Sequence, residues 1–421
     1  MLIIKKGQTM KKTFLLSTIC LSLISTGVSA TLFSNGPSTQ LNATIEEISV
    51  KAITADEGVF IDTDSDEFVL ERKEWQQIKA YVKSALKLPT TEAQMRSLFK
   101  IHSDEIEFSR FEAVLDQYND IKSSAKHWDT ALYPDIISLA LSLGNYNGIR
   151  ERFTQRITDS LNTIIEKAFS TDEESQLELE KARQMAIALL STLQSFSEQY
   201  QSQAAKAHSD LLEYATQMEE QRQQLQVLLD THGQELENDG SELKEKLATL
   251  NNQITDLNAE YDHYVAVSAS AVVYVWAPMF SIPVMGAFGK YAEDVRYKRN
   301  RILEEVEVLS QKLSTREKIY ASYDASAKSI DQIYNKLNDA IPHVNDVKLH
   351  WQKINAEFTT LIKALNNAQG KGSILQSNSF LSAAHSLANT TTVESNWSEI
   401  SRKAKRFVEN AYQQVQEGEA L

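Results

Sequence analysis

Cysteine, proline and glycine are scarce in this chain of 421 residues. The single cysteine, Cys20, lies near the N-terminus, so no disulfide can form within the chain and no thiolate site can be built. Only 6 prolines and 13 glycines are present, which is too few for a protein rich in β-strands or loops. No hairpin signal and no internal repeat is visible. The composition therefore predicts an all-α fold.

Motifs for catalysis and for metal binding are also missing. The eight histidines are scattered, and no H-E-x-x-H or G-x-S-x-G motif occurs. The run Gly286–Lys290 has the wrong glycine spacing for a phosphate loop. His343 and His350 stand one heptad apart, and a packed or solvated pair explains them better than a metal site. We expect no enzyme, no cofactor and no metal ion.

The N-terminus has the features of a signal peptide. Lys11 and Lys12 precede an apolar run from Phe14 to Ile24, and Val28-Ser29-Ala30 gives a small-residue cleavage site. The alternative, a membrane anchor, is disfavoured because the run is too short to span a bilayer. We therefore predict a signal peptide over residues 1–30, cleavage after Ala30 and secretion, with either Met1 or Met10 as the start.

The charge of the chain argues against nucleic acid as a partner. The whole sequence has 43 basic and 57 acidic residues. The predicted signal peptide contains four lysines and no acid, so the mature chain keeps 39 basic against 57 acidic residues, a net charge of −18. Binding to phosphates needs basic clusters, which an acidic chain of this kind does not supply over most of its length.

Helical patterns fill most of the remaining chain. An irregular arm is expected over residues 31–72, and Pro89 should close the first helix. We expect Gly144 to Gly148 to break a later helix, and Gly233 and Gly240 to weaken a long one. The expected helices and capping boxes are Lys73–Leu88, Thr91–Lys100, Glu107–His127, a run from Tyr133, Ile149–Phe169, a long helix capped by Thr171 and Glu174, Ser379–Leu387, and a last helix capped by Thr391 and Glu394.

Two long heptad patterns predict an antiparallel coiled-coil hairpin. The first runs from Leu243 to Tyr264, and the second runs from Ile302 to Leu365 with a bend expected at Pro342. Sixteen of nineteen core positions in the second are apolar, where composition alone would give roughly eight. The predicted domains are a helical body over 73–240 and 310–421, a coiled-coil neck over 241–264 and 290–309, and a head over 265–289.

The predicted head is a run of 25 residues without a charged side chain. Its alternative interpretation is a buried helical hairpin, but at the end of a rod little protein is available to cover it. Interspersed aromatic residues favour a membrane interface. The residues expected to enter the membrane are Val272, Val273, Tyr274, Val275, Trp276, Met279, Phe280, Ile282, Val284, Met285 and Phe288. Hinges are expected at Pro278, Pro283, Gly286 and Gly289.

A basic cluster follows the head directly. The same segment contains only two acidic residues, Glu293 and Asp294. The cluster could bind anionic lipid headgroups, or it could simply solvate the start of a helix. Its members are Lys290, Arg296, Lys298, Arg299 and Arg301.

Pro278 and Pro283 limit what the head can do in a membrane. They divide it into pieces of about 17–20 Å as helix, so neither piece spans a ~30 Å hydrocarbon layer alone.

These residues resemble a known family. The similarity rests on Glu74–Ile78, Leu86–Pro89, Leu132–Ile137 and Val272–Gly289, within a layout that covers most of residues 70–415. The chain resembles the α-pore-forming toxins of the cytolysin A and haemolysin BL group, and it is similar to the A component of the binary α-xenorhabdolysin type. The signal peptide departs from that family, in which many members lack one.

The resemblance implies a soluble monomer that binds a target-cell membrane through its head. It further implies that a B-type toxin component joins this chain in a hetero-oligomeric pore. A different class of function stays open: a periplasmic or secreted coiled-coil adaptor whose apolar tip docks a partner protein. Such adaptors usually add β-rich domains, for which the sequence gives no signal.

Overall fold

A computed structural model describes residues 48–55, 60–61, 66, 68–70, 73–98, 108–238, 241–243, 245–246, 248–249, 252, 297, 301, 304, 313–368 and 374–419. The predicted signal peptide and the predicted head lie outside these residues. The chain divides into two compact units, Met1–Thr44 and Ile45–Leu421, and all of the described residues belong to the second unit.

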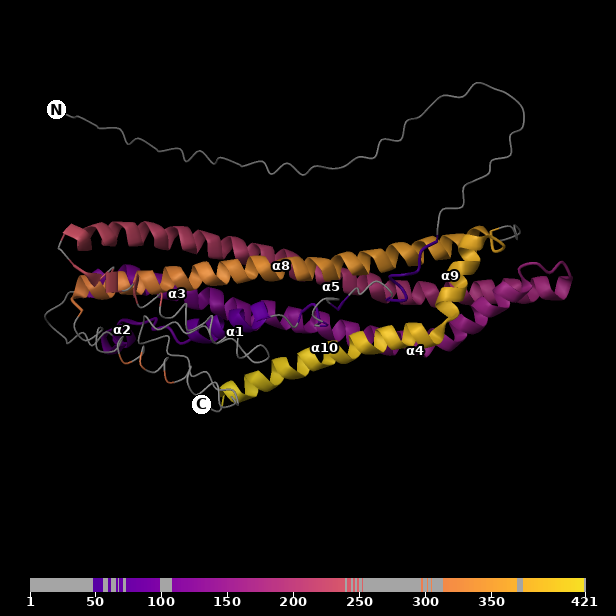
Figure 1. Cartoon of the computed structure of the whole chain (residues 1–421), viewed down its shortest axis with the longest axis horizontal. Helices are drawn as coiled ribbons and strands as arrows, with labels where there is room; N and C mark the ends of the chain where they lie inside the picture. The colour runs from indigo at the N-terminus through magenta and orange to yellow at the C-terminus, as the bar shows by residue number, and fades with distance from the viewer. Residues whose placement is uncertain are drawn as a thin grey trace, which may run out of the picture. The chain divides into compact units, whose positions relative to one another are not determined.

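The all-α prediction is confirmed for the described residues, whose regular elements are helices; one isolated β-bridge joins Ile61 and Phe68. Figure 1 shows the helices lying side by side as a bundle. In chain order they are α1 (Lys73–Ala85), α2 (Glu92–Leu98), the 3₁₀ helix η1 (Phe108–Phe111), α3 (Glu112–His127), the π-helix η2 (Trp128–Leu132), α4 (Tyr133–Lys167), α5 (Glu173–Asn238), α8 (Thr315–Asn367), α9 (Asn378–Ala388) and α10 (Thr390–Glu419).

Helices α5 and α8 form the long axis of the bundle. Their 66 and 53 residues correspond to about 99 and 80 Å. Arg183, early in α5, donates to the carbonyl of Leu365 at the end of α8. Ser241, just after α5, bonds to Glu317 in the first turn of α8. The two helices therefore run antiparallel. The first arm of the predicted hairpin, Leu243 to Tyr264, lies largely outside the described residues, so its pairing stays a prediction.

One row of the heptad positions predicted for α8 is buried. In the other row Tyr334, Lys348 and Ile362 are only partly buried, and a different buried stripe takes the place of that row. The predicted seam includes Ile330, Leu337, Val344, Trp351, Phe358 and Leu365. The second stripe, also spaced by sevens, is Ile333, Ala340, Val347, Ile354 and Leu361, each at most 1% exposed. Helix α8 packs on α5 and also meets α1 and α3. It is thus part of a multi-helix core, which a two-stranded coiled coil would not provide.

The predicted break at Gly144 to Gly148 is wrong. Helical backbone continues from Glu112 to Lys167, with a π turn at Trp128–Leu132 between α3 and α4. The amide of Tyr133 bonds to the carbonyl of Trp128, five residues back. Pro134 follows and has no N–H to continue the α pattern, so the π turn falls where a donor is missing. Packing of α4 against α5, α9 and α10 outweighs about 1 kcal/mol per helical glycine.

Two predicted capping boxes are also corrected. Asp172 accepts from the amide of Ser175 at 2.8 Å, so Asp172 caps α5 in place of Thr171. Helix α10 begins at Thr390, which puts Thr391 inside its first turn. Buried Gly233 lies within α5, which ends at Asn238, close to the predicted weak point. Helix α8 continues through Pro342, whose ring is exposed.

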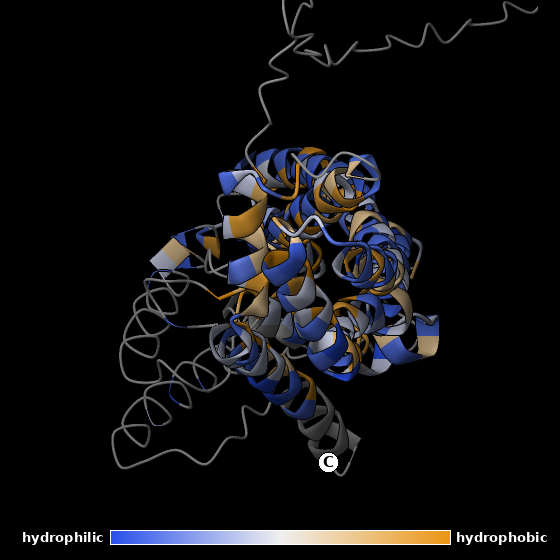
Figure 2. Cartoon of the chain, turned by 90° about the vertical axis from the view of Figure 1, so that its right-hand side faces the viewer, coloured by the Kyte–Doolittle hydropathy of each residue, from blue (hydrophilic) through white to orange (hydrophobic). Residues whose placement is uncertain are grey.

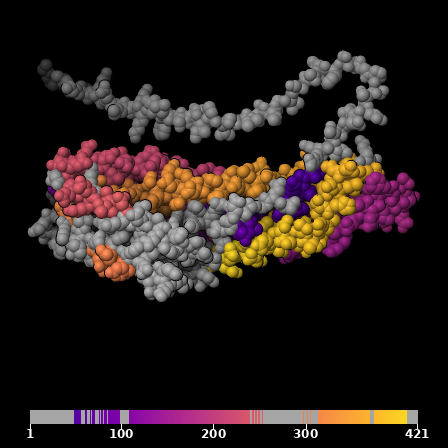
Figure 3. Space-filling model, viewed as in Figure 1, coloured from indigo at the N-terminus to yellow at the C-terminus, as the bar shows by residue number. Residues whose placement is uncertain are grey.

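The described part of segment 48–70 has no helix, as expected, but it belongs to the core. Phe60, Phe68 and Leu70 are fully buried. The segment, which we call the N-terminal strap, is held by polar contacts: the amide of Ile48 donates to Ser379, and the amide of Ile53 donates to Glu357 at 2.9 Å. These contacts tie it to α8 and α9. Figure 3 shows early-chain residues in indigo beside the later helices in orange and yellow.

A layer of aromatic side chains, the aromatic hub, joins the strap to four helices. Its members are Phe60 from the strap, Tyr146 from α4, Tyr200 from α5, Trp351 from α8 and Trp397 from α10. Ring centroids lie 4.9 Å apart for Tyr146–Trp397 and 5.2 Å apart for Tyr200–Trp351. The indole N–H of Trp397 donates to the carbonyl of Ile53 at 2.8 Å. Seen along the bundle, hydrophobic residues gather on the faces that the helices turn toward one another (Figure 2).

Candidate membrane-engaging site

Most of the predicted site lies outside the described residues. This holds for every predicted membrane-entering and hinge residue and for Lys290, Arg296, Lys298 and Arg299. Arg301 is described, and it is helical and exposed. Tyr297 nearby is helical with 67% of its surface exposed. Within the described residues, no helix is both long and apolar enough to cross a membrane.

The structure does describe the place where the chain leaves for the predicted head and returns from it. Ser241 and Glu317 stand 76 positions apart in sequence, yet the Ser241 hydroxyl donates to Glu317 Oε1 at 2.7 Å. The stretch between them, which contains the predicted head, therefore starts and ends at one point of the bundle. We call this point the clasp, defined by Ser241, Ser314 and Glu317.

A reciprocal cap fixes the α8 side of the clasp. The hydroxyl of Ser314 accepts from the amide of Glu317, and Glu317 Oε2 accepts from the amide of Ser314 at 2.8 Å. Partial burial by itself would raise the pKa of Glu317, but the hydrogen bonds from Ser314 and Ser241 lower that pKa overall. The carboxylate is thus held in its charged form, and α8 begins at a defined residue.

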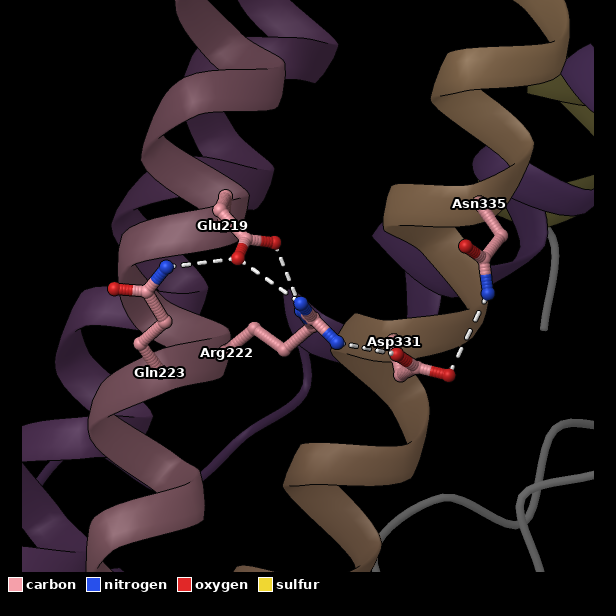
Figure 4. A network of polar contacts seen from close by, with 5 residues as sticks. All are labelled: Glu219, Arg222, Gln223, Asp331 and Asn335. Atoms are coloured by element: carbon pink, nitrogen blue, oxygen red, sulfur yellow. Dashed lines mark hydrogen bonds and ion pairs between the residues drawn. The ribbon is translucent and has the colours of Figure 1, made fainter. Parts of the chain in front are cut away.

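An ionic network joins the same two helices further along (Figure 4). Arg222 on α5 donates to Glu219 at 2.8 Å and to Asp331 on α8 at 3.1 Å. Its guanidinium also lies over the ring of Tyr334, 5.3 Å from the centroid. The hydrogen bond to Glu219 is the main cause of a raised pKa for Arg222. Asn335 donates to Asp331 from the next turn of α8.

A stacked pair of rings lies between the clasp and this network. His232 on α5 stacks on Tyr323 of α8, with centroids 5.2 Å apart and planes 19° apart. The imidazole also faces Glu235 at 3.3 Å. From Ile319 to Ser326, eight consecutive residues of α8 are buried. The clasp end of the α5–α8 pair is therefore well packed.

A buried lysine connects α1 to the π-helix. Lys79 is 8% exposed, and its ammonium lies 5.0 Å from the ring centroid of Tyr133. Burial lowers the pKa of Lys79 to about 8, repulsion from Lys83 adds to the effect, and attraction to Asp129 opposes it. This is a structural cation, since it faces the interior of the bundle.

Sequence reasoning missed most of these contacts. The cap of α8 could have been found, because Ser314-Thr315-Arg316-Glu317 is an S-x-x-E capping box. The Ser241–Glu317 bond, the Arg222 network and the His232–Tyr323 stack join residues far apart in sequence, and no local pattern signals them. No group of histidine, cysteine, aspartate or glutamate side chains that could hold a metal ion is present among the described residues.

Comparison with solved structures gives the fold a counterpart. The chain is similar to SmhA in its soluble form, from the tripartite α-pore-forming toxin Smh of Serratia marcescens. The TM-score is 0.53 at 13% identity, and the alignment covers 81% of this chain and 92% of SmhA. A second crystal form of SmhA gives a TM-score of 0.52 at the same identity. The chain thus has the fold of an α-pore-forming toxin component.

Other comparisons add no family assignment. XaxA from Xenorhabdus nematophila aligns at 14% identity over 84% of this chain and 99% of XaxA. Its TM-score of 0.34 is too low to support a similarity of fold. No family model matches the chain, and no curated protein matches it. The predicted similarity to an A component in particular therefore stays a prediction.

Proposed function

We propose that this chain is a secreted subunit of a pore-forming toxin. In this proposal residues 265–289 engage the target-cell membrane, and partner components complete an oligomeric pore. The single observation that carries the proposal is the clasp. It shows that an uncharged run of 25 residues belongs to a stretch that leaves and re-enters a long helical bundle at one point.

The shared fold with SmhA supports the toxin class, and the chain's own sequence supports the membrane role. An apolar run of this size must be covered or used, because exposed apolar patches promote association. The basic cluster of Lys290, Arg296, Lys298, Arg299 and Arg301 gives an acidic protein a local means to approach anionic lipid.

The division of the head supports the need for partners. Val265–Ala277 and Met279–Gly289 would each reach only about 17–20 Å as helix, against a ~30 Å hydrocarbon layer. A subunit whose own apolar pieces do not span would leave the crossing to another component. SmhA belongs to a toxin of three components. For this chain we propose a hetero-oligomer with at least one B-type component, starting from a soluble monomer.

Tryptophan fluorescence tests membrane engagement directly. Of the five tryptophans, Trp75, Trp128, Trp351 and Trp397 are at most 2% exposed, so their emission already reports a buried environment. We expect the secreted form to co-sediment with liposomes and Trp276 emission to shift to the blue. Liposomes that neither sediment the protein nor shift its spectrum would contradict the proposal.

Aspartate substitutions separate the head from apolar surface elsewhere. Val273→Asp and Phe280→Asp should abolish liposome binding while helicity is retained, because a charge in hydrocarbon is unfavourable. The matched controls are Leu212→Asp and Val227→Asp on α5, two residues that are 46% and 65% exposed. These controls should bind as the parent does. Equal loss in both sets would mean that binding does not depend on the head.

The basic cluster calls for a lipid comparison. Replacing Lys298, Arg299 and Arg301 by glutamine should weaken binding to liposomes that contain phosphatidylserine and should leave binding to zwitterionic liposomes unchanged. A similar loss on both lipids would mean that these residues stabilise the start of the helix and do not bind anionic lipid.

A lysis assay tests the need for a partner. We expect lysis to require a second long-helical protein encoded beside this one, and full lysis by this chain alone would contradict that part of the proposal.

A further inference from the structure

A buried polar layer crosses the middle of the α5–α8 pair. The Ser197 hydroxyl has two acceptors, Asn355 Oδ1 across the helix pair and the carbonyl of Gln194 within α5, and Asn355 Nδ2 donates to Gln201 Oε1. One turn away, Gln194 Nε2 donates to Thr359 Oγ1 at 2.9 Å. Ser197 is fully buried and Asn355 is 8% exposed. Polar side chains thus occupy positions that the heptad pattern would fill with apolar ones.

The hydrogen bonds of Asn355 reach another helix, whereas most other buried polar side chains of α8 bond within α8. Ser329, 2% exposed, donates to the carbonyl of Ala325 within α8. Ser322 likewise donates to Lys318 within α8. Bonds of that kind hold whatever the neighbouring helix does. The side-chain amide of Asn355 instead bonds to Ser197 and Gln201 of α5, so these hydrogen bonds depend on how the two helices are aligned.

The apolar stripes of α8 do not by themselves choose one alignment. They repeat every seven residues, so sliding α8 by one heptad would again set apolar residues against α5. The polar layer repeats only in part: Gln194 stands one heptad from Gln201, but no second donor stands one heptad from Ser197. A slide in either direction replaces Ser197 by Leu190 or by Ala204, and neither side chain can donate to Asn355 Oδ1. A buried amide oxygen without a donor disfavours the slipped state by about tenfold or more.

We propose that Ser197, Gln201 and Asn355 form a register lock between the two long helices. A slide of one heptad moves α8 along α5 by about 10 Å. Since α5 leads into the stretch with the predicted head and α8 leads out of it, such a slide would draw its two attachments apart along the axis. The lock fixes the relative position of these attachments. This inference does not depend on the proposed toxin function.

Distances between two spin labels measure the register. Labels are placed at the exposed positions Gln224 on α5 and Leu349 on α8, each changed to cysteine in a chain that carries Cys20→Ser. The two sites are offset by about 30 Å along the bundle, so a slide of one heptad changes the label distance by nearly 10 Å. In the parent we expect a single distance.

The test variant is Ser197→Ala with Gln201→Leu and Asn355→Leu. We expect a second distance, displaced by about 10 Å, in at least about a tenth of the molecules. Ser329→Ala is the matched control, because it removes a buried hydroxyl whose bond stays within α8, and it should keep the parent distance. A folded triple variant with only the parent distance would overturn the proposal and assign the register to the aromatic hub.

A second variant moves the lock instead of removing it. Ser197→Ala combined with Ala204→Ser offers Asn355 a donor one heptad further along α5. It should populate the displaced distance more strongly than Ser197→Ala alone. Because this pair changes buried volume little, it tests the proposal even if the triple variant does not fold. Identical distances for the pair and for the single variant would also overturn the lock.

Discussion

The α5–α8 pair is held together differently at the polar layer and at the clasp. At the polar layer, where Tyr200 lies between Ser197 and Gln201 and Trp351 lies one turn from Asn355, large aromatic rings from four helices and the strap pack at centroid distances of 4.9 to 6.3 Å. Toward the clasp, Tyr320 and Tyr323 of α8 are buried beside small side chains such as Ala321, Ser322 and Ala325. There the two helices are also joined by polar contacts at the clasp and in the Arg222 network.

This difference separates two tasks. Burying a large ring stabilises the fold more than burying a small side chain, since it removes more apolar area from water. Surface ion pairs and caps contribute little each, but they define where the helices begin and which residues face each other. We therefore assign stability mainly to the aromatic hub and alignment mainly to the clasp and the Arg222 network.

The largest expected effect comes from the aromatic hub. Trp351→Ala removes a ring that contacts Phe60, Tyr146, Tyr200 and Trp397. We expect the free energy of unfolding to fall by about 3–5 kcal/mol, because transfer and cavity costs add. Urea unfolding followed by circular dichroism measures it. A loss below about 1 kcal/mol would show that the hub is not the main source of stability.

A pH-dependent effect is expected at Lys79, beside the π-helix. Its folded pKa of about 8 lies below the ordinary value of 10.5, so between these values the unfolded chain binds more protons. The free energy of unfolding should therefore rise with pH from about 8 to about 9.5, by at most about 1.4 kcal/mol per unit. Above that range tyrosine ionisation intervenes.

Lys79→Met serves as the control for this titration. It should be more stable than the parent at about pH 7, where the parent keeps a buried charge, and it should lose the rise between about pH 8 and 9.5. A parent whose stability stays flat over that interval would mean that Lys79 is solvated in solution.

A moderate effect is expected at the clasp. Ser314→Ala removes the hydroxyl that caps α8 and should lower the free energy of unfolding by about 1 kcal/mol. Ser314→Asp, which can still accept from the amide of Glu317, should restore most of it. Equal losses for both variants would mean that the reciprocal cap does not form.

The smallest effect is expected at the ionic network. Arg222 and Asp331 are 40% and 50% exposed at their side chains, so Arg222→Gln should cost no more than about 1 kcal/mol. Added salt should reduce that difference further. A loss as large as that of Trp351→Ala would reverse the assignment of stability to the hub and position to the clasp.

Local patterns in the sequence were sufficient for much of the fold. The seven-residue spacing from Ile330 to Leu365 predicted the buried stripe of α8, and the scarcity of glycine and proline predicted helices. The break expected at Gly144 and Gly148 is wrong. The packing of α4 on α5, α9 and α10 outweighs the low helix propensity of glycine, and this packing is not visible in the local sequence. The cap expected at Thr171 is wrong because the neighbouring Asp172 accepts from the Ser175 amide, and Thr391 lies inside the first turn of α10.

The candidate site was predicted in part. The uncharged run and the basic cluster are features of sequence alone, and all but Arg301 of the named residues lie outside the described part of the chain. The clasp was not predicted as a contact. Ser241 and Glu317 meet only because α5 and α8 are aligned in one register, which no spacing within either helix specifies.

The sequence by itself determined that this protein is helical, that one face of α8 follows a seven-residue repeat and that an uncharged run lies in the stretch between α5 and α8. The spacing of apolar residues, the charge and the composition are local properties, so they can be recognised in the sequence without knowledge of the fold. Only the tertiary structure decided the register of α5 on α8, the burial of the N-terminal strap and the continuity of α4. Each of these depends on side chains brought together from distant positions, where packing and hydrogen bonding between helices outweigh local preference.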